Sequence, residues 1–443
     1  PRPLPPAPRP PPPAPCTLHP APCTLMNRSV ADNLSWSRLF IWPVILGLSI
    51  FGLCYIYSTG YIGDEYPVRE NWQRQLFYLL VGFVLFLILS HWDNRQFSWK
   101  IFLWGGYFAS LLGLVLVLFI GREVGGARRW LELGPFLLQP AEPAKIFTLL
   151  AGCYLLNRPA GGSRLFRLMA LPAVILIPAI LIKLEPALGN ALILFPPILA
   201  VLLVKYCPSK LFRCLLSACL ILIVVAICGL FWLRSIPPEE KSIEDKTTVS
   251  PPKKSSFLRG YHLRRLRSYV SGQGSWNERQ SIMTVASGGL HGKGFLDGTM
   301  KSLGYLPRTV APTDFIFSVI AEEGGFLYGS LPVLLLYALL LMICLHWGAT
   351  ASNALDSSIC TAFSSLTLCH LLIGIGMTIR LVPIMGLPLP LLSYGGSFTV
   401  SFMMGLGCTA ATRLHRNAPP QADTRSILQI RLGRLFNFSL NRL

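Results

Sequence analysis

The chain has 443 residues, of which 52% are hydrophobic and 13% are charged, and its mean hydropathy is +0.53. Apolar runs of about twenty residues recur along it, which is the length that a helix needs to cross a bilayer. These values exclude a chain of soluble domains. They predict an all-α polytopic membrane protein with about ten transmembrane helices.

The net charge is +19, which in a soluble protein would indicate nucleic-acid binding. Here the Lys and Arg residues lie mainly in connections between apolar runs, as they do in the cytoplasmic loops of membrane proteins. We therefore expect a membrane environment and no nucleic-acid partner. The side on which the positive charge gathers predicts that both termini are cytoplasmic.

Residues 1–25 are proline-rich and cannot form a packed core, so we expect a disordered segment or translated sequence upstream of the native coding region. The transmembrane domain is predicted at 26–412, and a basic cytoplasmic tail at 413–443. A large extracytoplasmic loop, about residues 234–311, separates spans seven and eight. The predicted spans are 39–58, 75–91, 101–120, 141–157, 166–184, 187–205, 211–233, 312–346, 357–380 and 388–412. The eighth is too long for one straight crossing, and its EEGGF sequence predicts either a break or an extension above the membrane.

The basic segment GREVGGARRW, residues 121–130, is predicted on the outer face, where positive charge is unusual. It indicates either an external anionic partner or local pairing of its arginines with Glu123 and Glu132. Both interpretations remain open from the sequence.

Ionisable residues inside apolar segments are costly, so each is a candidate for function. In LQPAEPAKIF, Glu142 and Lys145 are three residues apart and share one helix face, where they can pair. The pair either braces the bundle or belongs to an active site. Glu185 lies at the outer end of the fifth span, before a predicted break at 186–189, and either anchors that end or lines a cavity.

The second half of the outer loop has a short helical pattern at 278–286, a glycine-rich turn and aromatic residues, which favour a site over a tether. Where the loop enters the eighth span, Asp314 could cap the helix by accepting backbone N–H groups. Alternatively, Asp314, Glu322 and Glu323 could hold a divalent cation through oxygen ligands.

The segment RLVPIMGLPLPLLSYGGS, residues 380–397, places three prolines and three glycines at membrane depth. Broken backbone survives there only inside protein or beside water, so the segment either lines a cavity or shapes the bundle. Arg380 and the backbone amides of Tyr394, Gly395 and Gly396 are candidates for binding a phosphate. These features leave open a transporter for an anionic substrate and an intramembrane enzyme. The polar outer loop favours the enzyme.

Several motifs occur in the order found in the SEDS family (shape, elongation, division, sporulation), the group of RodA, FtsW and SpoVE. GMTIRLVPIMGLPLPLLSYGGS, residues 376–397, resembles the family signature. RRWLELGPFLLQPAEPAK resembles its RW…G…QPSE…K segment, and LEPALGNAL resembles its QPDLGTAL. The stretch from RQSIMTVASGGLHGKG to TDFIFSVIAEEGG resembles its outer-loop sequence QS…GSGG…GKG…TDFIF…EE.

The resemblance, closest to the elongation branch, implies a peptidoglycan glycosyltransferase that polymerises lipid II at the outer face of the bacterial cytoplasmic (inner) membrane. Its implied role is cell-wall elongation and cell shape. The implied partners are a class B penicillin-binding transpeptidase and elongation-complex proteins. The alternatives are a lipid II flippase, a catalytically degenerate scaffold for wall synthesis, and a role in division.

The resemblance also implies site residues, and one departure affects them. The family has an outer-loop Asp considered catalytic, whereas the corresponding residues 267–281 contain no Asp. We expect a substitute acid: Glu278, Asp314 or Glu322 as catalytic candidates, or one of Glu239, Glu240, Glu244 and Asp245. The substrate cavity is expected to contain Glu142, Lys145, Glu185, Gln280, Ser281, Arg380, Tyr394, Gly395, Gly396 and Ser397. A divalent cation, Mg²⁺ or Mn²⁺, is expected on Asp314, Glu322 and Glu323.

Overall fold

The computed structural model describes residues 35–61, 70–92, 97–124, 127–134, 136–157, 164–185, 187–206, 275–307, 309–351 and 353–414. The predicted 1–25 segment, the seventh span at 211–233, most of the outer loop and the tail from 415 lie outside them. The described residues fall into two units that divide between residues 43 and 44. Only the first turns of helix α2 are described in the first unit, so the arrangement below concerns residues 44–443.

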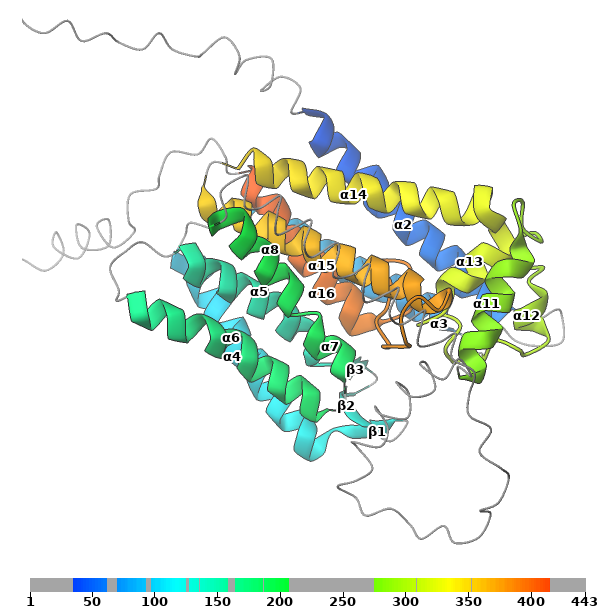
Figure 1. The fold of residues 1–443 in the computed structure, drawn as a ribbon, viewed down its shortest axis with the longest axis horizontal. Helices are drawn as coiled ribbons and strands as arrows, with labels where there is room; N and C mark the ends of the chain where they lie inside the picture. Colours follow the sequence, from blue (N-terminus) through cyan, green and yellow to red (C-terminus); the bar gives the residue numbers. More distant parts are fainter. Residues whose placement is uncertain are drawn as a thin grey trace, which may run out of the picture. The chain divides into compact units, whose positions relative to one another are not determined.

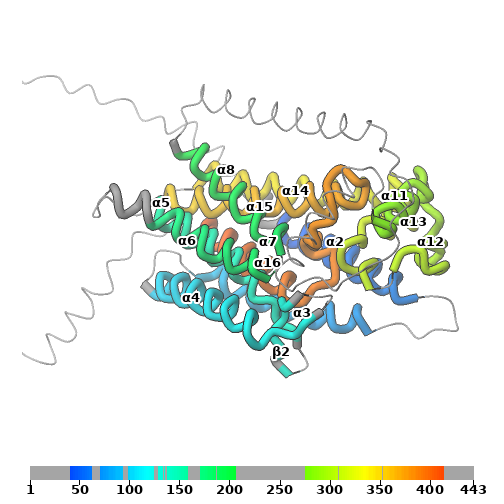
Figure 2. The backbone as a smooth tube through the Cα atoms, turned by 60° about the horizontal axis from the view of Figure 1, so that its bottom comes forward, coloured from blue at the N-terminus to red at the C-terminus, as the bar shows by residue number. Residues whose placement is uncertain are grey.

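The described residues are mostly helical (Figures 1 and 2). The helices before the outer loop are α2 (Ser35–Gly60), α3 (Asn71–Ser90), α4 (Phe97–Ile120), α5 (Ala141–Asn157), α6 (Arg164–Leu184), α7 (Leu188–Leu192) and α8 (Phe195–Tyr206). Those after it are α11 (Trp276–Gly288), α12 (Thr299–Ser302), α13 (Ile316–Gly324), the π-helix η1 (Gly325–Ser330), α14 (Leu331–Ala349), α15 (Ala354–Thr378) and α16 (Gly396–Leu414).

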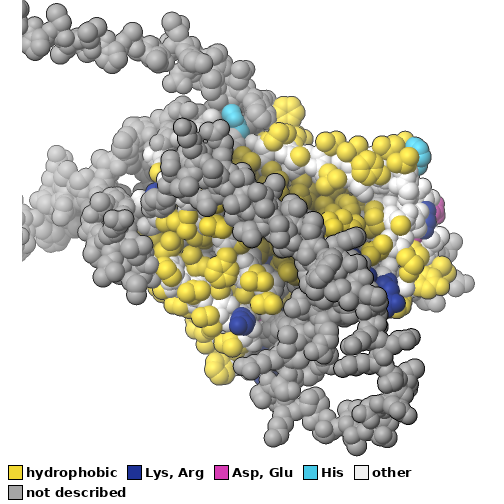
Figure 3. Space-filling view, in the orientation of Figure 1, with side chains coloured by type: hydrophobic (Ala, Val, Ile, Leu, Met, Phe, Trp, Pro, Cys, Tyr) yellow, Lys and Arg dark blue, Asp and Glu magenta, His cyan; other side chains and the backbone are white. Residues whose placement is uncertain are grey.

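Six described segments are long and apolar enough to cross a membrane, which confirms the predicted polytopic helical fold. They are Phe40–Gly60, Asn71–Ser90, Ser98–Ile120, Leu188–Lys205, Ile316–Ala349 and Ala354–Thr378. Large apolar side chains such as Leu80, Phe108 and Phe119 are exposed, as expected of helices that face lipid. Hydrophobic side chains are spread over the described surface that is visible in Figure 3, and charged side chains are few there.

The predicted break in the eighth span is confirmed. Helix α13 ends at Gly324, Gly325 adopts a φ of +64°, and one turn of π-helix leads into α14. The second predicted break is also present, because α6 ends at Leu184 and α7 begins at Leu188. Both breaks lie next to residues that the sequence marks as functional candidates.

A small antiparallel sheet between α4 and α5 was not expected from the sequence. Its strands are β1 (Arg122–Val124), β2 (Ala127–Leu133) and β3 (Phe136–Leu138), in the order β1-β2-β3. Arg122 pairs with Glu132 at 2.7 Å and Arg128 with Glu123 at 3.7 Å, all four side chains being largely exposed. The predicted local pairing of these arginines is therefore confirmed.

Buried helix faces pack through small residues. Gly407 of α16 approaches Phe86 of α3, and Gly106 of α4 lies against the ring of Phe147 of α5. A Cβ at Gly106 would come within 2.1 Å of that ring, whereas a Cβ at the neighbouring Gly105 would meet nothing within 4 Å. The two adjacent glycines therefore have opposite packing environments.

We expect Gly106→Ala to destabilise the fold by about 1–3 kcal/mol, because the buried Phe147 ring must move to accept the methyl group. Gly105→Ala is the matched control and should be neutral or stabilising by up to about 1 kcal/mol, since Ala favours a helix over Gly. Thermal unfolding of both variants in one detergent tests this. Equal melting temperatures for the two variants would contradict the proposed contact between α4 and α5.

Candidate functional site

The connection between α15 and α16, residues 379–395, is the irregular segment at the centre of the site. Its backbone takes positive φ at Arg380 (61°), Gly386 (66°) and Leu391 (64°). The carbonyl of Pro388 lies 3.2 Å from His370 Nδ1, and that of Pro390 accepts a 2.5 Å bond from the Tyr337 hydroxyl. Protein groups thus satisfy backbone that the prolines would otherwise leave unpaired.

This segment, which we call the broken loop, joins the candidate motifs to one another. A Cβ at Gly189 of α7 would lie 2.9 Å from Met385, and one at Gly386 would lie 3.8 Å from the Asp314 carboxylate. At the loop's end, Ser397 donates a bond to Leu137 O and accepts one from Gln139 N, just before α5. The loop therefore touches α7, the entry to α13 and the entry to α5.

The expectation that the turn at Tyr394–Gly396 offers its amides to a phosphate is wrong for two of the three amides. Tyr394 N donates to Pro312 O at 2.8 Å, and Gly395 N donates to Gln75 Oε1 at 3.1 Å. A Cβ at Gly396 would lie 2.5 Å from the Tyr78 ring, so the glycine permits close packing there. The turn consequently holds α16 to its neighbours.

Glu142 and Lys145 form the predicted ion pair at the start of α5. Their charged atoms are 2.9 Å apart, and both side chains are about nine-tenths or more buried. Lys145 also donates to Asn190 Oδ1 of α7 at 3.1 Å and lies 5.6 Å from the Phe398 ring centroid of α16. One lysine thus links three elements, and its charge is compensated inside the bundle.

Glu185 follows α6 and is 1% exposed. Neither oxygen of its carboxyl group has a hydrogen-bond partner in the described part of the chain, while Arg129 Nε donates to its backbone carbonyl at 2.9 Å. Burial raises the pKa of Glu185 to about 8; Arg129 opposes this shift and Glu142 adds to it. The carboxyl group is therefore mostly protonated at pH 7. An unfolded chain loses this proton near pH 4.5, so the contribution of Glu185 to folding stability falls as the pH rises toward 8.

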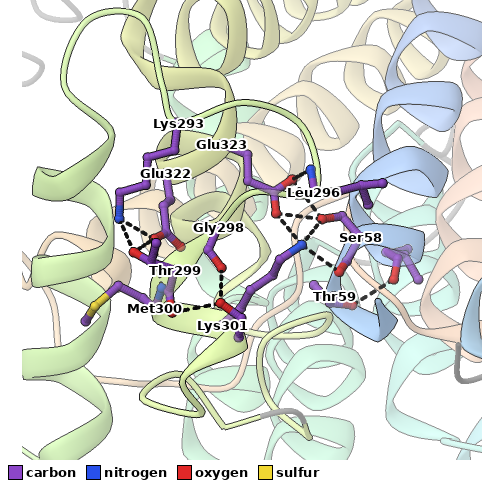
Figure 4. Close-up of polar contacts among 12 residues, drawn as sticks. Ser58, Thr59, Lys293, Leu296, Gly298, Thr299, Met300, Lys301, Glu322 and Glu323 are labelled. Atoms are coloured by element: carbon purple, nitrogen blue, oxygen red, sulfur yellow. Dashed lines mark hydrogen bonds and ion pairs between the residues drawn. The ribbon is translucent and has the colours of Figure 1, made fainter. Parts of the chain in front are cut away.

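A second cluster ties residues 289–306, which we call the outer segment, to α2 and α13. Its side chains converge in Figure 4. Lys301 lies 2.5 Å from Glu323, which also accepts bonds of 2.6 and 2.7 Å from the Ser58 hydroxyl. Lys301 donates to Ser58 O at 2.8 Å and contacts its hydroxyl. All three side chains are buried. We call this set, Ser58, Lys301 and Glu323, the outer lock.

The neighbouring Glu322 forms an ion pair with a different lysine, Lys293. Lys293 lies 2.6 Å from its carboxylate, which also accepts a 2.9 Å bond from the Met300 amide. Glu322 and Glu323 thus hold the chain that leads from α11 into α12, through Met300 N and Leu296 N respectively (Figure 4).

The predicted metal site on Asp314, Glu322 and Glu323 is not formed. Glu322 and Glu323 are each neutralised by a lysine, and no group of three His, Cys, Asp or Glu side chains among the described residues is placed to hold a metal ion. An ammonium group already supplies the positive charge that a cation would bring. These residues therefore do not fit Mg²⁺ or Mn²⁺.

Glu278 is placed at the start of α11, where it completes a capping box with Ser275. Its carboxylate accepts a 3.0 Å bond from Ser275 N and lies 3.9 Å from Arg380 Nε of the broken loop. Ser281, one turn later, contacts Ser318 of α13 at 2.7 Å and donates to Thr378 O of α15 at 2.8 Å. Gln280 is buried on the same helix. The predicted QS motif therefore joins α11 to α13 and α15.

Asp314 lies half-buried beside the broken loop. It does not cap α13, because that helix begins at Ile316 and its N-cap is Phe315, without a side-chain hydrogen bond. Among the three predicted catalytic acids it is the most accessible, since Glu278 and Glu322 are buried.

The structure also adds residues that sequence reasoning did not single out: Ser58, Asn190, Lys293 and Lys301. Ser58 and Asn190 carry no charge and sit in apolar runs, where nothing local distinguishes them. Lys293 and Lys301 had a signal, because two adjacent glutamates at membrane depth require compensating cations.

Known proteins match the part of the chain that contains these motifs. A family profile described as "Cell cycle protein", for FtsW, RodA and SpoVE, matches residues 38–418. Peptidoglycan glycosyltransferase MrdB of Escherichia coli K12 is 28% identical over 386 residues, which cover 86% of this chain and 95% of that protein. MrdB of Helicobacter pylori 26695 is 31% identical over 340 residues, covering 75% and 81%.

Solved structures agree with this assignment. A chain of a peptidoglycan synthase complex that coordinates polymerization and crosslinking is 28% identical and aligns with a TM-score of 0.60, over 85% of this chain and 98% of that one. The crystal structure of Thermus thermophilus rod shape determining protein RodA is 27% identical, with a TM-score of 0.56 over 85% and 96%. Because the profile match extends over most of the sequence, from the first span to the last, this chain belongs to the FtsW/RodA/SpoVE family.

Proposed function

We propose that this chain is a peptidoglycan glycosyltransferase that polymerises lipid II for cell-wall elongation and cell shape. The observation that carries the proposal is the match over residues 38–418, which includes the α5 ion pair, the α11–α13 segment and the broken loop. Relatives that match at this length are named peptidoglycan glycosyltransferases. The multi-pass helical fold suits a substrate anchored in lipid.

The proposed reaction joins C1 of the growing glycan to the 4-hydroxyl of an incoming lipid II with inversion. The new bond forms between C1 and the hydroxyl oxygen, while the bond from C1 to the pyrophosphate oxygen breaks. A carboxylate takes the hydroxyl proton, and the pyrophosphate leaves with the electron pair. We place this base at Asp314, with Glu278 as the second candidate, because Asp314 is accessible and adjoins the broken loop. Arg380 of the same loop would balance the charge of the leaving pyrophosphate.

The partner and the orientation complete the proposal. We infer that both termini are cytoplasmic, from the distribution of Lys and Arg, and that the broken loop and α11–α13 lie at the outer face. We infer a class B penicillin-binding transpeptidase as the partner, since a matched structure is a complex that coordinates polymerization and crosslinking. Relatives named FtsW also match, so a division role is the alternative biological setting.

The test is polymerisation of lipid II by the purified full chain, with and without its cognate transpeptidase, read as glycan ladders on a gel. We expect ladders from the wild-type chain. Asp314→Asn should lower the rate by at least about 100-fold if Asp314 is the base, within the usual range of general-base effects. Glu278→Gln in the same assay tests the second candidate.

The other results are also informative. Absence of ladders, with an active relative working alongside and the partner present, would overturn the polymerase in favour of a scaffold or a flippase. Translocation of labelled lipid II in vesicles would then identify the flippase. Less than about tenfold loss in both acid variants would reject both base assignments.

A further inference from the structure

Large apolar side chains are exposed where the outer segment meets η1. Leu290 of the outer segment is 62% exposed, and Tyr328 of η1 is 64% exposed. We call the exposed set at this junction the apolar patch: Leu290, Phe295, Phe326, Leu327 and Tyr328. A cluster of exposed apolar side chains marks a surface that contacts a partner or a membrane.

Backbone hydrogen bonds hold the two parts of the apolar patch together. The Leu327 amide donates to Leu290 O at 3.0 Å. The Phe326 amide donates to Gly289 O, also at 3.0 Å. Because these bonds join the start of the outer segment directly to η1, Leu290 lies at the same level of the molecule as η1.

Two membrane spans give the depth of the apolar patch. Helix α14 has 19 residues and is about 28 Å long, which nearly equals the thickness of the apolar core of a bilayer. η1 directly precedes α14, so it lies where that core ends. Phe295 gives an independent measure, because its ring centroid is 5.8 Å from that of Tyr55, which belongs to the span Phe40–Gly60. Both measures place the patch at the boundary of the core.

The apolar patch continues the exposed face of α14. Tyr328, Leu335 and Met342 are spaced by seven residues, and each is more than half exposed. A spacing of seven keeps side chains on one face of a helix. One exposed apolar face therefore runs from the middle of this span up to the patch.

The backbone beside the apolar patch is suited to contact with lipid. Irregular chain at membrane depth must bond to protein, because the apolar core offers its amides no water. The Lys293 amide donates at 3.0 Å to Glu322 O, near the end of α13. The Gly294 amide donates at 3.0 Å to the next carbonyl, that of Glu323. The Lys293 ammonium group is paired with the Glu322 carboxylate, and the η1 sequence GFLYGS has no charged residue. These polar groups thus point inward while the patch faces outward.

We propose that the apolar patch is inserted in the outer leaflet of the membrane, at the boundary between lipid headgroups and acyl chains. Its partner is the lipid surface, where aromatic side chains are favoured at this depth. The inserted patch holds the outer segment at a fixed height in the bilayer. Lipid contact does not depend on the polymerase reaction, so absence of glycan ladders would leave it unaffected.

The experiment places a fluorescent amino acid at one position at a time in the full chain, reconstituted alone in lipid nanodiscs. Tyr328 and Leu290 are the test positions, because they belong to different segments. Met342, exposed in the middle of the span, is the control for the apolar core. Glu123, exposed and charged on β1, is the control for water. The quenchers are iodide in solution and a nitroxide attached near either the headgroup end or the methyl end of the acyl chains.

We expect both test positions to be quenched more by the nitroxide near the headgroup end than by the one near the methyl end, and Met342 to show the opposite order. Iodide should quench both test positions several-fold less than it quenches Glu123. The four side chains are exposed, so the fold should accept the fluorescent group at each position.

Four results would overturn the proposal. Strong quenching by iodide at both test positions, without quenching by either nitroxide, would place the patch in water. Lipid quenching at Tyr328 but not at Leu290 would leave the outer segment outside the membrane. The Met342 order at both test positions would place the patch inside the apolar core. Protection from iodide that requires the cognate transpeptidase, still without lipid quenching, would make the patch a protein interface.

Discussion

Lys145→Met is expected to abolish polymerisation and to lower the free energy of unfolding by about 3–5 kcal/mol, because it leaves the Glu142 carboxylate buried without its ion pair. The substitution also removes the bond to Asn190, which joins α5 to α7. A shift of about 1 Å in a positioned group can cost about 100-fold in rate. The measurements are thermal unfolding in detergent and the rate of glycan formation.

The double variant Glu142→Gln/Lys145→Met separates stability from function. Removing both charges eliminates the unpaired buried carboxylate, so most of the lost stability should return. Activity should stay low if the charges organise the substrate cavity, and should return if the pair only braces the bundle. Lys183→Met, at an exposed lysine, is the control for loss of a positive charge. A single Lys145→Met variant with wild-type stability and activity would contradict the structural assignment of this pair.

Lys301→Met is expected to release the outer segment from α2 and α13 and to destabilise the protein by about 3–5 kcal/mol. It leaves Glu323, which is 1% exposed, with no cation at 2.5 Å, and it removes the bond from Lys301 to Ser58 O. The amides of residues 289–306 should exchange hydrogen faster, because their anchor to α2 is lost. Polymerisation should fall with this local opening, since Lys301 pairs with Glu323 of α13 and Asp314 lies at the entry to that helix.

Lys293→Met is the matched control for the outer lock. It removes the lysine of the same segment that pairs with the adjacent Glu322, and the Lys293 side chain is 24% exposed whereas that of Lys301 is 3% exposed. Its effect should be smaller, since more exposed ion pairs contribute less. Lys301→Met together with Glu323→Gln should recover part of the stability. Equal hydrogen exchange in Lys301→Met and wild type across 289–306 would show that the outer lock does not hold this segment.

The predictions that succeeded rest on local patterns. The spacing of Glu142 and Lys145 on one helix face predicts their pairing, and the glycines after Glu323 predict the break before α14. The helical pattern at 278–286 is confirmed as part of α11. Each depends on residues within one or two helical turns, and such residues are close in space because they are close in sequence.

The predictions that failed required knowledge of distant partners. The metal-site prediction rested on three carboxylates. The sequence alone does not show that Lys293 and Lys301 neutralise two of them. The prediction of a phosphate site at Tyr394–Gly396 failed because the amides of Tyr394 and Gly395 already donate to Pro312 and Gln75. In both cases the competing group is a protein atom brought in from another part of the chain.

The sequence by itself determined the membrane-spanning helical fold and the places where helices break, because bilayer thickness and backbone hydrogen bonding impose these on any chain of this composition. The order of its motifs indicated the family, which the match over residues 38–418 shows. Only the tertiary structure decided which charges compensate one another. Ser58 and Lys301 are 243 residues apart, yet they share a buried hydrogen bond. The tertiary structure also distinguished Glu185, whose carboxyl group is buried without a hydrogen-bond partner among the described residues, from the paired Glu142. A buried charge is stable only beside its partner, and the fold alone sets which groups become neighbours.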